Sequence, residues 1–171
     1  MNRLACVTAT VALTSMVPTF PALADPAATL RDLLPAGYSS DTCQAIDRGA
    51  ALAAMSCGPN SLAGGPTSAV YQIFADHAAL QKAFSAVVNG VDWTATTCPG
   101  AKSPDPIPLR ISDGTTYGSV ACGRARTFQT DRDGAVVWTR DTDNFLGVAW
   151  AVYQGQSYPA NLYAWLRAQV T

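Results

Sequence analysis

The spacing of apolar residues along the chain predicts three helices, each with one face to bury. The predicted helices cover residues 26–34, 77–88 and 159–170. Asp76 and the Asn89-Gly90 pair are typical capping residues at the two ends of the second helix. The three apolar faces consist of Leu30, Leu33 and Leu34; of Leu80, Phe84, Val87 and Val88; and of Leu162, Trp165 and Leu166.

Strands are predicted between the helices. Residues 67–74 alternate, with Ala69, Tyr71 and Ile73 on one face. Short apolar or alternating runs also occur at 91–98, 107–112, 116–122, 126–130, 135–140 and 145–152. Residues 50–57 are small and apolar and fit either a helix or a buried strand, and the run at 52–57 favours the strand. Asp-Gly turns between several of these runs are typical of an antiparallel meander. We therefore expect an α+β domain with one antiparallel sheet of about five to seven strands and two or three helices packed on one side.

The first 24 residues have the pattern of an export signal. Arg3 precedes the uncharged apolar stretch Leu4–Val17, and the small-residue sequence at 22–24 fits a cleavage site. The mature chain is then a single domain over 25–171, with no membrane span after cleavage. A lipoprotein or an uncleaved anchor is the alternative, although Cys6 lies before most of the apolar stretch, where lipid attachment does not occur.

Four cysteines would remain after cleavage: Cys43, Cys57, Cys98 and Cys122. An even number in an exported chain predicts two disulfides. We expect the sequential pairs Cys43–Cys57 and Cys98–Cys122, each contributing about 3 kcal/mol in the loop-entropy model. The spacings do not fit the short Cys-x-x-Cys pairs of structural zinc, and the chain holds a single histidine. No metal or other cofactor is therefore expected.

The net charge of the mature chain gives no indication of a partner. The mature chain would carry ten Lys and Arg residues against twelve acidic residues, all of them Asp. A balance this close to neutral provides no basic surface for nucleic acid or anionic lipid. Asp favours turns and caps over helix interiors, which agrees with the many predicted turns.

Candidate catalytic residues are few. His77, the only histidine, is predicted to be an exposed first-turn residue of a helix. The sequence has no G-x-S-x-G elbow, and no lysine follows Gly64–Thr67 as a phosphate loop requires. Asp131 and Asp133 are the best candidates for a carboxylate mechanism, but they are more simply a hairpin turn. A calcium loop aligned on Gly134 would have unsuitable residues at both ends. We therefore expect no catalytic residue.

Aromatic residues gather in the last third of the chain, where Trp138, Trp150, Tyr153 and Trp165 occur. The simpler interpretation is that they are core residues beneath a helix. The alternative is an aromatic-lined groove for a sugar, lipid or peptide. These four residues are the candidate ligand-binding residues of the sequence.

Several motifs carry a family resemblance. They are Leu34-Pro35-Ala36-Gly37-Tyr38 before Cys43, Ser56-Cys57-Gly58-Pro59-Asn60, Gly65-Pro66-Thr67-Ser68-Ala69 with Tyr71 and Phe74, Val120-Ala121-Cys122-Gly123, Val137-Trp138-Thr139 with Asp141, and Leu162-Tyr163-Ala164-Trp165. Together they resemble small secreted actinobacterial proteins of the mycobacterial type. They are also similar to the extracytoplasmic modules of some bacterial serine/threonine kinases. The resemblance implies an extracytoplasmic location and a sensor-like or binding role, and it carries over no catalytic residue.

The sequence therefore favours a secreted, non-enzymatic binding or sensor-like module of the cell envelope or extracellular space, with a small ligand or an envelope or host protein as its partner. One alternative is a secreted hydrolase that uses Asp residues. The other is a protein-interaction factor that acts on a host or envelope protein.

Overall fold

The computed structural model describes residues 25–125, 134–152 and 159–170. Within these ranges the chain forms three α-helices: α1 (Pro26–Asp32), α2 (His77–Val88) and α3 (Ala160–Gln169). All three agree with the predicted helices to within two residues at each end. No helix of the described part is long and apolar enough to cross a membrane.

The described strands form one antiparallel sheet. They are β1 (Cys43–Ala45), β2 (Ala53–Cys57), β3 (Ser68–Ile73), β4 (Trp93–Thr96), β5 (Ile107–Arg110), β6 (Thr116–Ala125), β7 (Gly134–Arg140) and β8 (Phe145–Ala151). The order is β1-β2-β3-β8-β7-β6-β4, and β5 also pairs with β6. The single antiparallel sheet is confirmed, with eight strands where we expected at most seven. The additional strand is β1, and the strand predicted at 126–130 lies outside the described residues.

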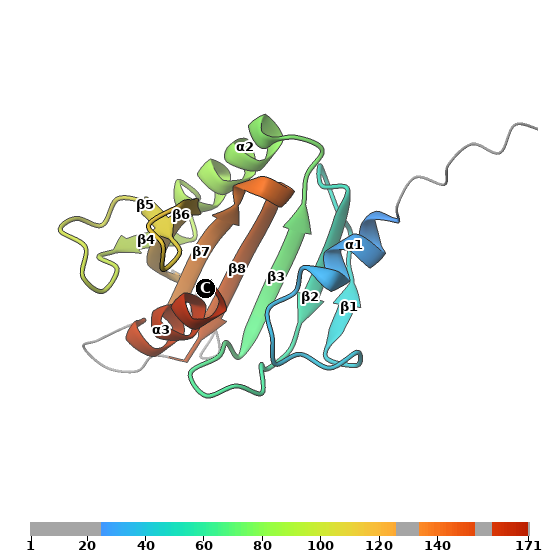
Figure 1. Ribbon diagram of the computed structural model, residues 1–171, viewed down its shortest axis with the longest axis horizontal. Helices are drawn as coiled ribbons and strands as arrows, with labels where there is room; N and C mark the ends of the chain where they lie inside the picture. Colours follow the sequence, from blue (N-terminus) through green and yellow to red (C-terminus); the bar gives the residue numbers. More distant parts are fainter. Residues whose placement is uncertain (1–24, 126–133, 153–158, 171) are drawn as a thin grey trace, which may run out of the picture.

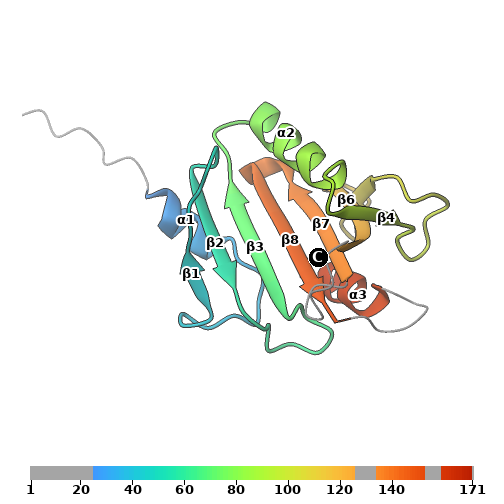
Figure 2. The same cartoon turned by 180° about the vertical axis from the view of Figure 1, so that it is seen from behind.

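Helices cover both faces of this sheet. Two of them, α1 and α3, share one face (Figure 1), and α2 crosses the opposite face (Figure 2). Leu30, Leu162 and Leu166 accordingly belong to one buried cluster, while Leu80 and Phe84 belong to another. Two helices on one side agree with the prediction, and the second layer formed by α2 was not expected.

Burial along the strands follows from this three-layer arrangement. In β3 the predicted alternation is confirmed, because Ala69, Tyr71 and Ile73 are buried and their neighbours only partly so. In β7, by contrast, six consecutive residues from Gly134 to Thr139 are buried. A strand that is covered on both faces needs apolar residues on both, which explains the continuous apolar run.

Both predicted disulfides are confirmed. Cys43 and Cys57 lie directly opposite each other on β1 and β2, with their Cα atoms 4.1 Å apart. Cys98 follows β4 and bonds to Cys122 of β6, with a Cα–Cα distance of 5.1 Å. Each disulfide therefore fastens an edge strand, or the loop beside it, to its neighbour in the sheet.

Two glycines make room for tryptophan rings. The Trp138 ring lies over Gly147, its cross-strand partner, so closely that a Cβ atom there would be 2.6 Å from Cε2 and Cη2 of the indole. On the opposite face, a Cβ at Gly123 would lie 2.7 Å from Cη2 of Trp93. Large rings thus cover the positions where the sheet has no side chain of its own.

Candidate functional site

Trp138 and Trp165, two of the four candidate aromatic residues, meet in the core. Their ring centroids are 6.1 Å apart in an edge-to-face arrangement. Their exposed fractions are only 2 % and 4 %. Tyr71 and Phe145 extend this cluster, with Tyr71 stacked on Phe145 at 5.8 Å. These two tryptophans therefore join α3 to the sheet.

The other two candidate residues are not part of that cluster. Trp150 packs against the buried cluster under α2, on the opposite face of the sheet. Tyr153 lies outside the described residues. The described members of the set are thus divided between the two faces of the sheet and do not form one common wall.

His77 is the first residue of α2 and is exposed, as predicted. The preceding Asp76 caps the helix, because its carboxylate accepts a hydrogen bond of 2.8 Å from the backbone N–H of Ala79. Among the described residues, no group of three His, Cys or Asp side chains is placed to hold a metal ion.

Several carboxylates of the described chain hold turns. Asp25, Asp47 and Asp113 each accept a hydrogen bond from the backbone N–H two residues ahead. The bond from the Thr115 N–H lowers the pKa of Asp113. Asp113 is therefore an ionised turn residue, which does not supply the proton that a general acid needs. The two carboxylates singled out for catalysis, Asp131 and Asp133, lie outside the described residues.

Arg140 and Asp143 form an ion pair at the turn between β7 and β8. Partial burial acts to raise the pKa of Asp143, but the hydrogen bonds from Arg140 and Thr142 outweigh it and lower the pKa. Tyr117 also contacts Arg140, with its hydroxyl 3.5 Å from Nη1. The pair fixes the turn and leaves a carboxylate that stays ionised.

A groove runs between the loop at 62–64 and the outer side of α3. Its volume is about 500 Å³. We call it the α3 groove. It is lined by Leu62, Ala63, Gly64, Asn161, Ala164, Trp165, Ala168 and Gln169. None of these side chains carries a charge, and the two amides come from the first and last turns of α3.

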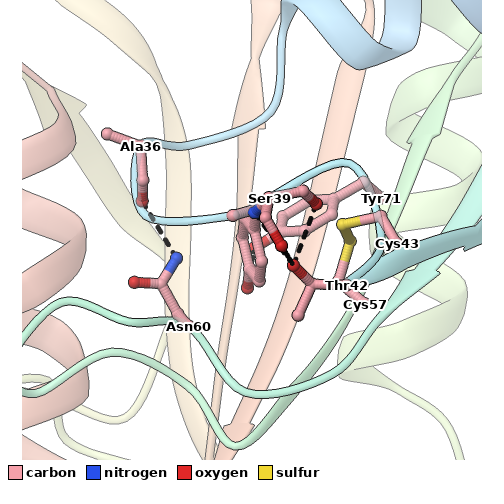
Figure 3. Close-up of a disulfide and its surroundings, with 8 residues drawn as sticks. Ala36, Ser39, Thr42, Cys43, Cys57, Asn60 and Tyr71 are labelled. Atoms are coloured by element: carbon pink, nitrogen blue, oxygen red, sulfur yellow. Dashed lines mark hydrogen bonds between the residues drawn. A yellow bond between two sulfur atoms is a disulfide. The ribbon is translucent and has the colours of Figure 1, made fainter.

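Asn60 holds the loop that forms one wall of this groove. Its Nδ2 donates a hydrogen bond of 2.9 Å to the Ala36 carbonyl (Figure 3). Its Oδ1 accepts a hydrogen bond of 2.9 Å from the Leu62 N–H. Gly37 has φ +95°, and a Cβ there would lie 2.8 Å from Leu62 Cγ. The close approach of the two loops therefore requires glycine at this position.

The same segment is also tied to α3. The Ala36 N–H donates a hydrogen bond of 2.9 Å to Oε1 of Gln169. Ala36 thus contacts both Asn60 and the last turn of α3, so the two walls of the α3 groove are held by a shared residue.

A second, smaller hollow of about 290 Å³ lies on the other side of Ala36. We call it the Cys43 pocket. Its lining consists of Arg31, Leu34, Pro35, Ala36, Tyr38, Ser39, Ser40 and Cys43. The hydroxyls of Ser39 and Thr42 hydrogen-bond at 2.7 Å and fix the turn before β1 (Figure 3). The pocket is therefore built from one continuous stretch between the end of α1 and the start of β1.

Tyr38 joins this pocket to the core. Its hydroxyl is 2.8 Å from that of Tyr71. Burial raises the pKa of Tyr38, and burial together with the neighbouring Tyr38 raises that of Tyr71 well above its ordinary value. Both phenols are therefore neutral at physiological pH and act as a hydrogen-bonded pair.

Sequence reasoning identified neither hollow, although one of its four candidate residues, Trp165, lines the α3 groove. The α3 groove joins residues about 100 positions apart, and the glycines of its loop indicate no more than a turn. The available signal was the pair of exposed alanines Ala164 and Ala168, one helical turn apart on the side of α3 that faces away from Leu162 and Leu166. Small exposed residues are too common on helices to identify a groove without the opposing loop.

Comparisons with known proteins found no match: no protein-family model, no curated protein and no solved structure is similar to this chain. The resemblance to small secreted actinobacterial proteins therefore stays a prediction.

Proposed function

We propose that this chain is a secreted, non-enzymatic binding or sensor-like module of the cell envelope or extracellular space, and that the α3 groove is its ligand site. The groove carries the proposal because its volume of about 500 Å³ lies in the range of small-molecule sites, roughly 300–1,000 Å³.

The lining indicates what kind of ligand fits. No charged side chain lines the groove, so an ionic ligand would lose hydration there without gaining a partner. Leu62 is 43 % exposed, which gives an apolar contact surface, and the amides of Asn161 and Gln169 provide hydrogen-bonding groups. An uncharged molecule with an apolar body and a few polar groups suits this combination best.

Two further observations support the location. Disulfides persist in oxidising compartments, and this chain has two. The pattern of the first 24 residues provides an export route. Together with the resemblance described above, they support a location outside the cytoplasm.

Thermal shift measurements would test the groove. The protein is screened against uncharged saccharides, cell-wall fragments, lipids and apolar peptides. A ligand at 100 times its Kd adds about 2.7 kcal/mol, which raises the midpoint by several degrees in a domain of this size. Ala164→Trp would fill the groove, because Ala164 is exposed and lines it. We expect this variant to lose the shift.

The matched control is Ala86→Trp, at an exposed alanine of α2 on the opposite face of the sheet. It should keep the full ligand-induced shift. A shift that persists in Ala164→Trp would show that the ligand binds elsewhere and would overturn the assignment of the groove. Turnover of any screened compound would favour the hydrolase, whereas a flat screen with specific capture of an envelope or host protein would favour the interaction factor.

A further inference from the structure

The two disulfides differ in how far they are covered. Cys57, Cys98 and Cys122 are buried, with exposed fractions of 2 %, 3 % and 0 %. Cys43 is only partly buried and lines the Cys43 pocket. Cys43 is therefore the one cysteine of the described chain that a small molecule can approach from solvent.

The bond also lies at the weakest edge of the sheet. The strand that carries Cys43, β1, has three residues and pairs only with β2. Edge elements with few contacts open locally at a much lower free energy than the sheet centre. Cys122, in contrast, lies on β6, where it is paired with β4 on one side and β7 on the other.

The one charged side chain in the lining of the Cys43 pocket is positive. Arg31 at the end of α1 is the charged residue in its lining, and the remaining side chains are neutral. A positive charge beside a concave surface raises the local concentration of negatively charged reactants. The reactive form of a thiol is its thiolate anion.

From these three observations we propose that the Cys43–Cys57 disulfide is a site of thiol–disulfide exchange, at which the thiolate of a low-molecular-weight thiol attacks Sγ of Cys43 from the Cys43 pocket. The S–S bond breaks, a mixed disulfide forms on Cys43, and Cys57 leaves as a thiolate that takes a proton from water. A second thiolate then attacks the sulfur of the added thiol and releases Cys43. Two thiols are oxidised to one disulfide, and the protein disulfide gains their two electrons.

Exchange at this position would remove the covalent link between β1 and β2 and leave the rest of the sheet intact. The segment that precedes β1 includes Ala36, which contacts both Asn60 and Gln169. The redox state of this bond is thus linked to a wall of the α3 groove, although the exchange itself does not depend on any ligand there.

Timed reduction of the oxidised full chain tests the proposal. The protein is incubated with glutathione under native conditions, free thiols are alkylated at intervals, and tryptic peptides are quantified by mass spectrometry. Each cysteine falls in a different peptide: 4–31 for Cys6, 32–48 for Cys43, 49–82 for Cys57, 83–102 for Cys98 and 111–124 for Cys122. Cys98–Cys122 therefore acts as an internal control in every sample.

We expect Cys43 and Cys57 to be alkylated about tenfold faster or more than Cys98 and Cys122, since access controls the rate of exchange. Far-UV circular dichroism should change little during this phase, because only the edge strand opens. Equal rates for the two disulfides, or faster reduction of Cys98–Cys122, would overturn the proposal.

Paired variants identify the attacked sulfur. In a Cys6→Ser background, Cys57→Ser leaves Cys43 as the free thiol of the pair, and Cys43→Ser leaves Cys57. The Cys43 thiol should react with glutathione disulfide about tenfold faster or more than the Cys57 thiol. Equal reactivity of the two thiols would refute attack at Cys43.

A pocket-filling variant tests the route of approach. Ser40 is exposed and lines the Cys43 pocket. Ser40→Trp should slow the reduction of Cys43–Cys57 several-fold and leave the rate for Cys98–Cys122 unchanged. An unchanged rate for Cys43–Cys57 would refute approach through the pocket.

Discussion

Replacing Gly147 by alanine is a sharp test of how the core under α3 is packed. The backbone of Gly147 is not in the left-handed region, so alanine is allowed there on conformational grounds. In an open strand position the change from glycine to alanine would stabilise the protein by about 0.5–1 kcal/mol. The sign of the measured effect therefore depends on the ring that covers the position.

That ring has little room to move. The new Cβ would lie 2.6 Å from Cε2 and Cη2 of Trp138, whereas an ordinary contact between carbon atoms is about 3.5–4.0 Å. The indole must shift by about 1 Å, and Tyr71, Phe145 and Trp165 surround it with ring centroids 6.0, 6.4 and 6.1 Å away. Overpacking of this kind costs about 1–3 kcal/mol. We expect Gly147→Ala to destabilise the protein by a net amount of about 1–2 kcal/mol.

Urea denaturation followed by far-UV circular dichroism measures this difference without relying on tryptophan fluorescence. A double-mutant cycle with Trp138→Leu isolates the clash, because leucine lacks the indole atoms that the new Cβ meets. Trp138→Leu alone should cost about 2–4 kcal/mol through the cavity that it leaves. In the Trp138→Leu background, Gly147→Ala should leave the free energy of unfolding unchanged or raise it. The effect of the alanine should therefore differ by about 1–3 kcal/mol between the two backgrounds, and this difference is the coupling energy.

Gly123→Ala is the matched comparison, since Trp93 covers Gly123 from the opposite face. Trp93 belongs to the four-residue edge strand β4 and is 8 % exposed, so it can yield more easily than Trp138. We expect a smaller loss for this variant. Additive effects in the Gly147 cycle, or a stabilising Gly147→Ala, would refute the packing argument.

Two further predictions concern titratable groups. Tyr71→Phe removes the hydroxyl that hydrogen-bonds to Tyr38 and should cost about 1 kcal/mol at pH 7. Burial and Tyr38 raise the pKa of Tyr71 above 10.0, so Tyr71 ionises in the unfolded chain at a lower pH than in the folded protein. The free energy of unfolding of the wild type should therefore fall above pH 10. In urea titrations, the difference in stability between the wild type and Tyr71→Phe should shrink over the same range. Asp143→Asn should cost about 0.5 kcal/mol at pH 7 by loss of the partly exposed pair with Arg140. The pKa of Asp143 is lowered from 3.8, so this difference should vanish as the pH falls below 3.8; a constant difference would contradict the assignment.

Elements with strong local signals were predictable from the sequence. The bounds of α2 match the prediction because Asp76 caps its first turn and Asn89 ends it, and both signals lie within a few residues of the helix. The alternation in β3 and the sequential disulfide pairs are local in the same sense. β1 was missed because three residues, two of them exposed, leave no alternation to detect.

Features that depend on distant parts of the chain were not predictable in this way. The position of α2 on the second face depends on the side of the sheet over which the chain passes between β3 and β4. The residues of α2 and its neighbours do not indicate that side. The continuous apolar run of β7 did indicate two covered faces, but it was interpreted as a strand covered on one. The α3 groove requires Gly64 and Asn161 to meet, with Asn161 O 3.1 Å from the position of a Gly64 Cβ. Aromatic content pointed to Trp138, which lies in the core, and to Trp165, which lies in the core and also lines the α3 groove.

The pairing of β3 with β8 has a consequence for how this protein folds. Residues 68–73 pair with residues 145–150, so the centre of the sheet joins two parts of the chain that are far apart in sequence. In a growing or translocating chain, the edge of β3 that pairs with β8 would stay unpaired until β8 becomes available. Such long-range closure slows folding and leaves an edge open to pairing with other chains in the meantime. The sheet can therefore be completed only after β8 and α3 have become available.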